Sequence, residues 1–562
     1  MTHPPGWWRD AVVYQIYPRS FADSDGDGEG DLPGITAKLE HLRDLGVDAL
    51  WLSPCYPSPQ VDGGYDVADY RGVDPRFGTL ADLDALVARA TDLGLAVLLD
   101  LVPNHCSDRH PWFQAALRAG PGSPERALFH FRDGRGRDGV QPPNNWRSVF
   151  GGSAWTRITD PDGRAGQWYL HLFDRSQPDW NWDHRRVGEE FESVLRFWLD
   201  RGIAGFRVDV APGLVKRSGL PDDPHEGRAH LAAAARADPA AGPADPADVG
   251  PMWDQDGVHD VYAAWRRVLD EYADPERVFV AEAWLPSPDR TARYVRTGEM
   301  HLSFAFGFLD SAWTAPALRS SIDAALATMS AVGAPCAWVL SNHDVVRTAS
   351  RLGLPQDRLR PHGIRASDPQ PDEALGLRRA RAAAMVLLAL PGAAFLYQGE
   401  ELGLPDHTAL PDDSREDPVW RRSGGRETGR DGCRVPLPWA ADAPGFGFGP
   451  SSRTWLPQPP DYARYAVDRE RRTPGSTLQL YRTLLALRRR RGLGRGTLTW
   501  GDRIEDPGVL EMRIEGADAV RVVVNFGPDP VALPADAQVL VASDALTDDG
   551  QVPTDVAVWA AG

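Results

Sequence analysis

Short apolar segments alternate with amphipathic helical segments along most of the chain, and this rhythm constrains the fold more than any other feature. Residues 12–17 form the first apolar segment, and the helical pattern after it places Ile35, Leu39, Leu42 and Leu45 on one face. Such alternation is typical of β-α units in a parallel sheet. Eight candidate strands follow from it: residues 12–17, 49–52, 96–102, 203–208, 278–281, 302–306, 336–340 and 393–397. Eight units predict a (β/α)8 TIM barrel, whose chemistry lies at the carboxyl ends of the strands.

Two interruptions of the rhythm predict further domains. The third and fourth candidate strands lie about 100 residues apart, more than one helix and two loops need. Near residue 493 the pattern changes to short strands separated by Gly, Pro and Asp turns, which is typical of antiparallel sheets. We therefore expect a barrel from residues 1–104 and 174–492, an inserted subdomain at 105–173, and a C-terminal antiparallel, sandwich-like β domain at 493–562. Long insertions at 217–257 and 402–473 are expected to roof the site.

Composition excludes several classes of protein. With 562 residues, 42% of them hydrophobic, the chain can bury a large core. Its net charge of −18 disfavours a nucleic-acid partner, because phosphate binding needs basic surfaces. The four cysteines form no C-x-x-C pair, the first residues lack a secretory pattern, and the longest apolar stretch is broken by Pro391 and Gly392. We expect a cytoplasmic protein without a membrane span, and the sequence does not indicate its oligomeric state.

Four candidate strands end in charged or imidazole groups. The segments are VPNH at 102–105, GFRVD at 205–209, VAEAW at 280–284 and LSNHD at 340–344. A buried structural pair would explain any one of them. All four, however, converge on one rim of a barrel, so a catalytic centre is the better interpretation.

Taken together, the motifs resemble those of glycoside hydrolase family 13, the α-amylase superfamily. QIYPRSF, DLVPNHCS, GFRVDVA, EAW and NHDVVR occur in the family's order, with GGYDVADY and QGEE in addition, and the resemblance covers almost the whole chain. RDGCRVPLPW is similar to the RDNSRTPMQW-type motif of α-glucosidases and oligo-1,6-glucosidases. The resemblance implies an exo-acting enzyme of that branch, with small oligosaccharides or glucosides as substrates.

The resemblance also implies catalytic roles. Retaining cleavage of a glycosidic bond needs one carboxylate as nucleophile and one carboxylic acid as proton donor. By motif position, Asp209 is the nucleophile, Glu282 the acid/base and Asp344 the carboxylate that stabilises the transition state. Arg207 faces the same side of its strand as Asp209 and is expected to keep that carboxylate ionised. A purely structural Arg207–Asp209 ion pair is the alternative.

Five further residues are expected to bind the sugar. Tyr65 and Asp66 resemble the residues that stack under the glucose ring and bind its outer hydroxyls, and Arg430 is expected to share that task with Asp66 and to close the pocket. His105 and His343 are expected to donate hydrogen bonds to the same ring. The alternatives are a solvated loop cation at Arg430 and satisfied buried histidines at the other two positions.

An acidic loop near the start of the chain indicates a structural calcium site. Carboxylates at every second position, separated by glycines, offer the hard oxygen ligands that Ca²⁺ prefers. By resemblance to the calcium loop of this branch, the ligands are the side chains of Asp23, Asp25, Asp27 and Asp31 and the carbonyl of Glu29. Mg²⁺ or a solvated acidic turn are the alternatives, and we expect no organic cofactor.

The sequence therefore predicts a retaining α-glucosidase that releases glucose from the non-reducing end of short α-glucosides. Val210 is typical of α-1,6-acting enzymes, whereas residues 211–214 look more like α-1,4-acting ones, so α-1,4 is favoured. Sucrose, trehalose and aryl glucosides stay open as substrates. A transglucosidase that uses the same intermediate is the second hypothesis, and a non-catalytic binding relative is the third.

Overall fold

The computed structural model describes residues 3–224, 249–357, 361–535 and 537–561. Eight parallel strands form one sheet in the order β10-β11-β1-β2-β3-β7-β8-β9. Their bounds are β1 (Val12–Ile16), β2 (Ala49–Leu52), β3 (Ala96–Leu101), β7 (Gly205–Val208), β8 (Val278–Ala281), β9 (Leu302–Ser303), β10 (Ala337–Val339) and β11 (Ala393–Tyr397). A parallel bridge between Phe304 and Ala337 joins the two edges. The predicted (β/α)8 barrel is confirmed.

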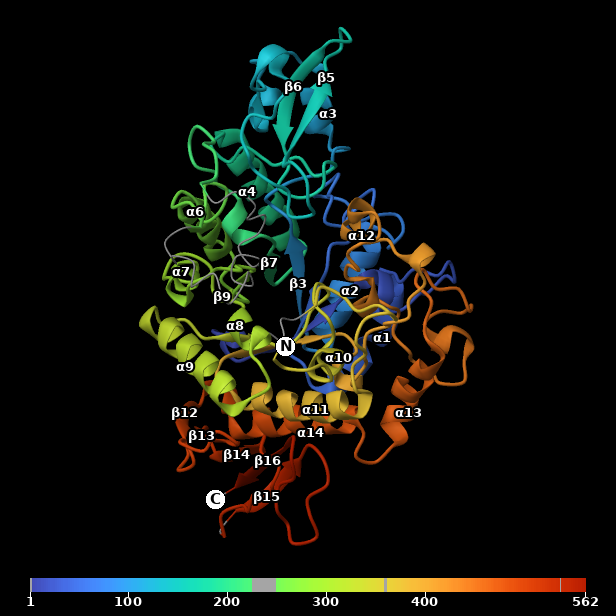
Figure 1. Cartoon of the computed structure of the whole chain (residues 1–562), viewed down its shortest axis with the longest axis vertical. Coiled ribbons are helices and arrows are strands. Elements are labelled where there is room, and N and C mark those ends of the chain that lie inside the picture. Colours follow the sequence, from blue (N-terminus) through green and yellow to red (C-terminus); the bar gives the residue numbers. More distant parts are fainter. Residues whose placement is uncertain (1–2, 225–248, 358–360, 536, 562) are drawn as a thin grey trace.

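Helices pack around the outside of this barrel (Figure 1). The longer ones are α1 (Leu32–Leu45), α2 (Leu80–Asp92), α4 (Arg185–Leu199), α6 (Val258–Asp270), α9 (Ala315–Ala331), α11 (Glu373–Ala389) and α14 (Thr477–Arg491). The shorter ones are α3 (Pro111–Arg118), α7 (Pro288–Arg293), α8 (Phe306–Asp310), α10 (Thr348–Leu352), α12 (Pro418–Ser423) and α13 (Val467–Arg472). Local signals fix several ends: the Asp31 side chain caps α1, and Thr79 forms a capping box with Asp82 at the start of α2.

A small antiparallel sheet lies between β3 and β7 in the chain, where the inserted subdomain is predicted. Its strands β4 (Phe131–Arg132), β5 (Trp155–Thr159) and β6 (Ala165–Leu170) pair in the order β4-β6-β5. Together with α3 it forms the upper end of the molecule in Figure 1. Part of the other expected roof, residues 225–248, lies outside the described residues.

The C-terminal part contains one antiparallel sheet, so the expected sandwich-like arrangement is wrong. The strands are β12 (Thr497–Trp500), β13 (Val509–Glu515), β14 (Val520–Asn525), β15 (Gln538–Ala542) and β16 (Val556–Ala561), in the order β12-β13-β14-β16-β15. A second sheet is unnecessary because α11 covers one face: the buried Trp559 indole donates to the Met385 carbonyl over 3.0 Å. Valines such as Val523 and Val552 form a small core on the other face.

All four cysteines are free and buried. No helix in the described ranges is long and apolar enough to cross a lipid bilayer.

Candidate active site

Arg207 lies at the centre of a cluster of carboxylates at the carboxyl ends of β3, β7 and β8. Its guanidinium is 1% exposed, and Nη1 donates to Oδ1 of Asp209 (2.6 Å) and Oδ1 of Asp100 (2.8 Å). Nη2 lies 2.9 Å from Oε2 of Glu282. One buried guanidinium therefore holds the predicted nucleophile and the predicted acid/base side by side.

Arg207 acts on the Asp209 pKa in the predicted direction, but burial of the cluster acts against it. Burial raises the pKa of Asp100 to about 6, although Arg207 opposes the rise. Burial also raises the pKa of Asp209, with Glu282 and Asp100 adding to the rise and Arg207 opposing it. Because three carboxylates share one cation, pairing with Arg207 does not by itself keep Asp209 ionised. Asp100 and Asp209 therefore bind protons more tightly than free aspartates do.

Asp344 follows β10 and lies between two arginines. Nη1 of Arg430 and Nη2 of Arg434 each approach its Oδ1 to 2.9 Å. Burial acts to raise the pKa of Asp344, but His343, Arg430 and Arg434 together lower it. Asp344 is therefore a fixed negative charge near the acid cluster.

Arg430 is not a solvated loop cation. Besides Asp344, it contacts Oδ1 of Asp62 through Nη2 (2.7 Å) and Oδ2 of Asp417 through Nε (2.6 Å). The guanidinium thus connects the loop after β2 with the loop after β10.

Asp66 does not face this site, contrary to the prediction. It is fully buried and accepts hydrogen bonds from Ser58 Oγ (2.9 Å) and from the backbone N–H groups of Val61 (3.0 Å) and Asp62 (3.1 Å). Gly63 and Gly64 have φ values of 56° and 101°, a conformation that L side chains rarely adopt, and this turn brings Asp62 rather than Asp66 to Arg430. Asp66 shapes the loop, and Asp62 takes the position expected for it.

Tyr65 and His343 lie next to the acids, and His105 contacts the Tyr65 carbonyl through Nε2 at 3.1 Å. The Tyr65 ring stacks on His343 with centroids 5.2 Å apart and planes 4° from parallel, and its hydroxyl donates to Oδ2 of Asp100 over 2.9 Å. His343 Nε2 lies 3.3 Å from Oδ2 of Asp344. His105 Nδ1 lies 3.0 Å from the amide nitrogen of Asn104. Burial lowers the pKa of His105 to about 4 and that of His343 well below its usual value, so both rings are neutral near pH 7.

Four residues of the site were not predicted from the sequence: Asp62, Asp100, Asp417 and Arg434. Asp100 carries a usable signal, because it is a charged residue within an otherwise apolar strand. Arg434 lies four residues after Arg430 in the RDGCRVPLPW segment. Asp62 and Asp417 lie in loops whose course the sequence does not indicate.

The inserted region contributes aromatic residues to the rim. Phe150 lies 5.6 Å from the Arg430 guanidinium, and Phe173 packs against His105 at 4.9 Å. Arg422 of α12 ties this rim to the barrel, because its Nη1 donates to the Phe173 carbonyl over 3.2 Å and lies 3.4 Å from Oδ2 of Asp174.

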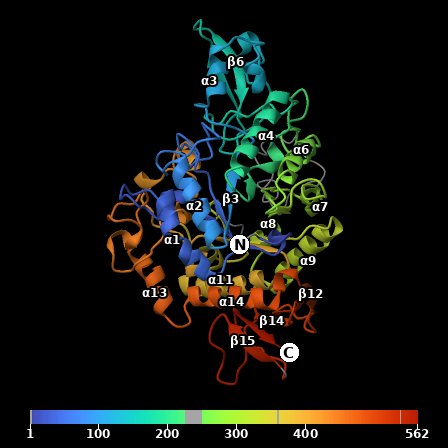
Figure 2. The same ribbon diagram turned by 180° about the vertical axis from the view of Figure 1, so that it is seen from behind.

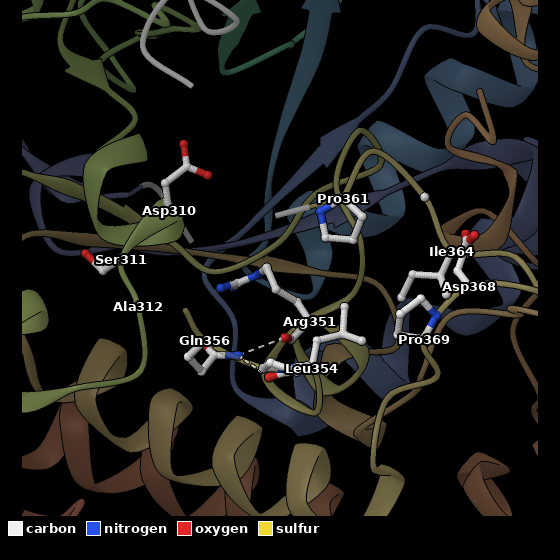
Figure 3. A pocket seen from close by; sticks show the side chains of 12 residues that line it. Asp310, Ser311, Ala312, Arg351, Leu354, Gln356, Pro361, Ile364, Asp368 and Pro369 are labelled. Carbon is white, nitrogen blue, oxygen red and sulfur yellow. Dashed lines mark hydrogen bonds between the residues drawn. The ribbon is translucent and has the colours of Figure 1, made fainter. Parts of the chain in front are cut away.

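A separate cavity of about 260 Å³ lies beside the loop that carries Asp344 (Figure 3). Arg351 lines it and donates from Nη2 to the Leu340 carbonyl over 2.9 Å. Gln356 also lines it and donates to the Arg351 carbonyl over 3.1 Å. None of the carboxylates around Arg207 lines this cavity, so it is distinct from the candidate active site.

The acidic loop brings part of the predicted metal-ligand set together. One carboxylate oxygen each of Asp23, Asp25 and Asp27 lie within 4.8 Å of one another. Asp31 lies nearby, but its oxygens accept from the N–H of Gly34 (2.6 Å) and from Ser24 (2.8 Å). The Glu29 side chain pairs with Arg19 at 2.8 Å, and the predicted ligand at this position, the Glu29 carbonyl, stays a prediction. The three neighbouring carboxylates fit a hard divalent cation.

The barrel with its acid cluster defines the class of protein, a TIM-barrel glycoside hydrolase. The family model for the alpha amylase catalytic domain matches residues 15–496, and a domain of unknown function, DUF3459, matches residues 502–561. The chain therefore belongs to the α-amylase family, glycoside hydrolase family 13, in its α-glucosidase branch. This membership confirms the predicted resemblance.

Several relatives are similar over most of their length. A probable α-glucosidase of Rhizobium meliloti is 38% identical over 86% of this chain and 82% of its own. A salivary α-glucosidase of Anopheles gambiae is 34% identical over 95% and 86% of the two chains, and an oligo-1,6-glucosidase of Parageobacillus thermoglucosidasius 32% over 92% and 90%.

Among solved structures, the alpha-glucosyl transfer enzyme XgtA is 36% identical with a TM-score of 0.83 and full coverage of both chains. An isomaltulose synthase mutant of Erwinia rhapontici, in complex with sucrose, is 30% identical over 99% of both chains, with a TM-score of 0.82.

Proposed function

We propose that the protein is a retaining, exo-acting α-glucosidase that releases glucose from the non-reducing end of short α-glucosides. One observation carries this proposal: Asp209 and Glu282 both contact the Arg207 guanidinium, at 2.6 and 2.9 Å. Contact with one guanidinium places both carboxyls in the same site, which supports the pair that a retaining mechanism needs about 5 to 5.5 Å apart; inverting enzymes hold the two about 6.5 to 9.5 Å apart to admit a water.

The proposed reaction has two steps. An Asp209 oxygen attacks the anomeric carbon while the glycosidic C–O bond breaks and Glu282 gives its proton to the departing oxygen. Glu282 then takes a proton from water, whose oxygen displaces Asp209 from the same carbon. The reactive state has Asp209 ionised and Glu282 protonated, with Asp344 stabilising the positive charge on the sugar ring in both steps.

The network around Arg430 supports attack at a chain end. Arg430 holds Asp62, Asp344 and Asp417 within 2.9 Å and lies under Phe150. We infer that this network blocks one side of the terminal glucose, so that the chain end is the point of attack. We infer α-1,4 over α-1,6 linkages, with the maltase names among the relatives in support.

A proton NMR time course with maltose, and in parallel with isomaltose, tests the proposal. We expect α-glucose to appear first, from the non-reducing end, and maltose to be the faster substrate. Initial β-glucose contradicts retention, and faster isomaltose hydrolysis reverses the linkage preference.

Transglucosylation is the second candidate, because one of the solved structures described above is named an alpha-glucosyl transfer enzyme and the other an isomaltulose synthase. The same intermediate then passes to a sugar hydroxyl instead of water. In the NMR experiment, new glycosidic signals at high maltose concentration indicate transfer, and glucose alone indicates hydrolysis.

We also propose that Asp23, Asp25 and Asp27 hold a structural Ca²⁺, whose charge offsets the repulsion between the three carboxylates. Calcium is expected to raise the melting temperature of metal-free protein, with a smaller effect of Mg²⁺. The double variant Asp25→Asn/Asp27→Asn should lose this response, whereas the exposed Asp548→Asn should keep it. An unchanged melting temperature with and without calcium contradicts the assignment.

The four buried, free thiols support a cytoplasmic location, where cysteines stay reduced. Fractionation of the source cells, with activity recovered in the soluble intracellular fraction, is the expected result; activity in the medium contradicts it.

A further inference from the structure

The two carboxyl oxygens of Glu282 have different surroundings. Oε2 accepts the backbone N–H of Val210 over 2.9 Å and lies 2.9 Å from Nη2 of Arg207. Oε1 accepts the indole N–H of Trp284 over 3.1 Å. The carboxyl of the proposed acid/base is thus held by three donors from three different parts of the site.

These contacts decide which oxygen handles the proton. A carboxyl oxygen has two lone pairs, and both lone pairs of Oε2 face fixed donors. One lone pair of Oε1 accepts the Trp284 N–H, and the other lone pair can carry a proton. We propose that Oε1 is the oxygen of Glu282 that gives and takes the proton, and that Trp284 is a positioning residue which directs its remaining lone pair toward the glycosidic oxygen.

Trp284 is itself held in place, as a positioning residue must be. It lies two residues after Glu282 and is half-buried. Its ring stacks on Phe306, the first residue of α8, with centroids 3.6 Å apart and planes 4° from parallel. The Glu282 carbonyl accepts the Ala211 N–H over 3.0 Å, so the backbone between the two side chains is anchored as well. The indole therefore meets Oε1 in a fixed direction.

The inference rests on the proposed function and predicts an unequal loss. Trp284→Phe keeps an aromatic ring on Phe306 but removes the N–H. Departure of a poor leaving group, such as the second glucose of maltose, needs a proton in the transition state, whereas a dinitrophenolate departs without one. Misdirecting the proton should therefore slow only the first kind of substrate.

The experiment measures kcat/KM for a series of aryl α-glucosides with different leaving groups, and for maltose. In Trp284→Phe we expect a fall of about 10- to 100-fold on maltose, comparable to the loss of a hydrogen bond to a charged group. The fall on 2,4-dinitrophenyl α-glucoside should stay within about 3-fold, so that the dependence on leaving-group basicity steepens. Phe306→Leu, which loosens the stack but keeps the N–H, is the matched comparison and should steepen that dependence less than Trp284→Phe does.

If Trp284→Phe lowers kcat/KM equally for all substrates, or leaves its dependence on leaving-group basicity unchanged, the proposal is overturned. Trp284 is then a packing residue. An equal or larger change in Phe306→Leu overturns it too, because the effect then follows the packing and not the N–H. If Trp284→Phe does not fold, as judged by its melting temperature, Trp284→Leu is measured in its place and judged by the same criteria. Wild-type protein inactive on every α-glucoside in the series would instead refute the proposed function, a different result.

Discussion

Arg207 and Val210 show how single residues of the loop after β7 set up the proposed chemistry. Arg207 is buried between three carboxylates, so replacing it would leave negative charges without a partner in a site that water scarcely reaches. Val210 has a φ of 46°, a left-handed conformation that is costly for a β-branched residue. This conformation places its N–H on Glu282. Strain at Val210 is thus tied to the position of the acid/base.

At this scale we predict opposite effects for two neighbouring aspartates. Asp62→Asn should lower kcat/KM on maltose by about 10- to 100-fold, because it removes a charged acceptor beside Arg430, and should barely change the melting temperature. Asp66→Asn sets an amide N–H against backbone N–H donors and should destabilise the protein by about 1 to 3 kcal/mol. Enzyme kinetics and thermal unfolding of both variants check this. The reverse pattern would restore Asp66 as the sugar-binding residue.

The barrel elements were largely predictable, and the exceptions have physical causes. Strands β2, β8 and β11 have the predicted bounds because long-range packing and local pattern agree there. Strand β9 ends at Ser303, three residues early, because α8 begins at Phe306 and bends the chain away. The turn at Gly63 and Gly64 and the packing of the C-terminal sheet on α11 depend on tertiary contacts, which explains the errors over Asp66 and over the sandwich.

Glu400 links three elements and predicts a pH dependence of stability. It follows β11, accepts from Tyr481 of α14 over 3.1 Å and from Ser341, after β10, over 2.6 Å. Burial raises its pKa to about 7, and Glu401 adds to the rise. The unfolded chain ionises this group near its usual 4.5, so between pH 4.5 and 7 the unfolded state binds fewer protons and stability falls as the pH rises.

Glu400→Gln should remove this effect. Relative to the variant, the wild type should lose roughly 3 kcal/mol of unfolding free energy between pH 4.5 and 7, with little further change above pH 7. Denaturant unfolding of both proteins across this range measures the difference. If the unfolding free energies of wild type and variant differ by the same amount at every pH, the raised pKa of Glu400 is contradicted.

In the molecule as a whole, the acid cluster and the C-terminal sheet lie far from each other. The acid cluster lies at the carboxyl ends of the strands, whereas the sheet of β12–β16 lies at the opposite end from the inserted region, beneath α11 and α14 (Figure 2). Parallel strands bring motifs that lie far apart in the sequence to one rim, which is why the segments that carry Asp209, Glu282 and Asp344 could be expected to converge, whereas their roles rest on the resemblance.

This separation predicts that damage to the C-terminal sheet lowers stability without altering the reaction. Trp559→Ala removes a fully buried side chain from the contact with α11 and should cost about 3 to 5 kcal/mol. At 25 °C the folded variant should keep kcat within about twofold. Val539→Ala, at a 42% exposed position of β15, is the control and should change neither quantity. Calorimetry and kinetics check both, and a parallel loss of kcat in Trp559→Ala would show that the two ends are coupled.

The central claim is that Asp209 forms the covalent intermediate, and trapping that intermediate tests it most directly. A 5-fluoro-glucosyl fluoride of α configuration reacts in the first step and leaves the second one slow, so the adduct can be located by mass spectrometry of peptides. We predict one fluoroglucosyl group on the peptide that contains Asp209, and none in Asp209→Asn. A label on another carboxylate, or an active enzyme that is never labelled, would contradict the account.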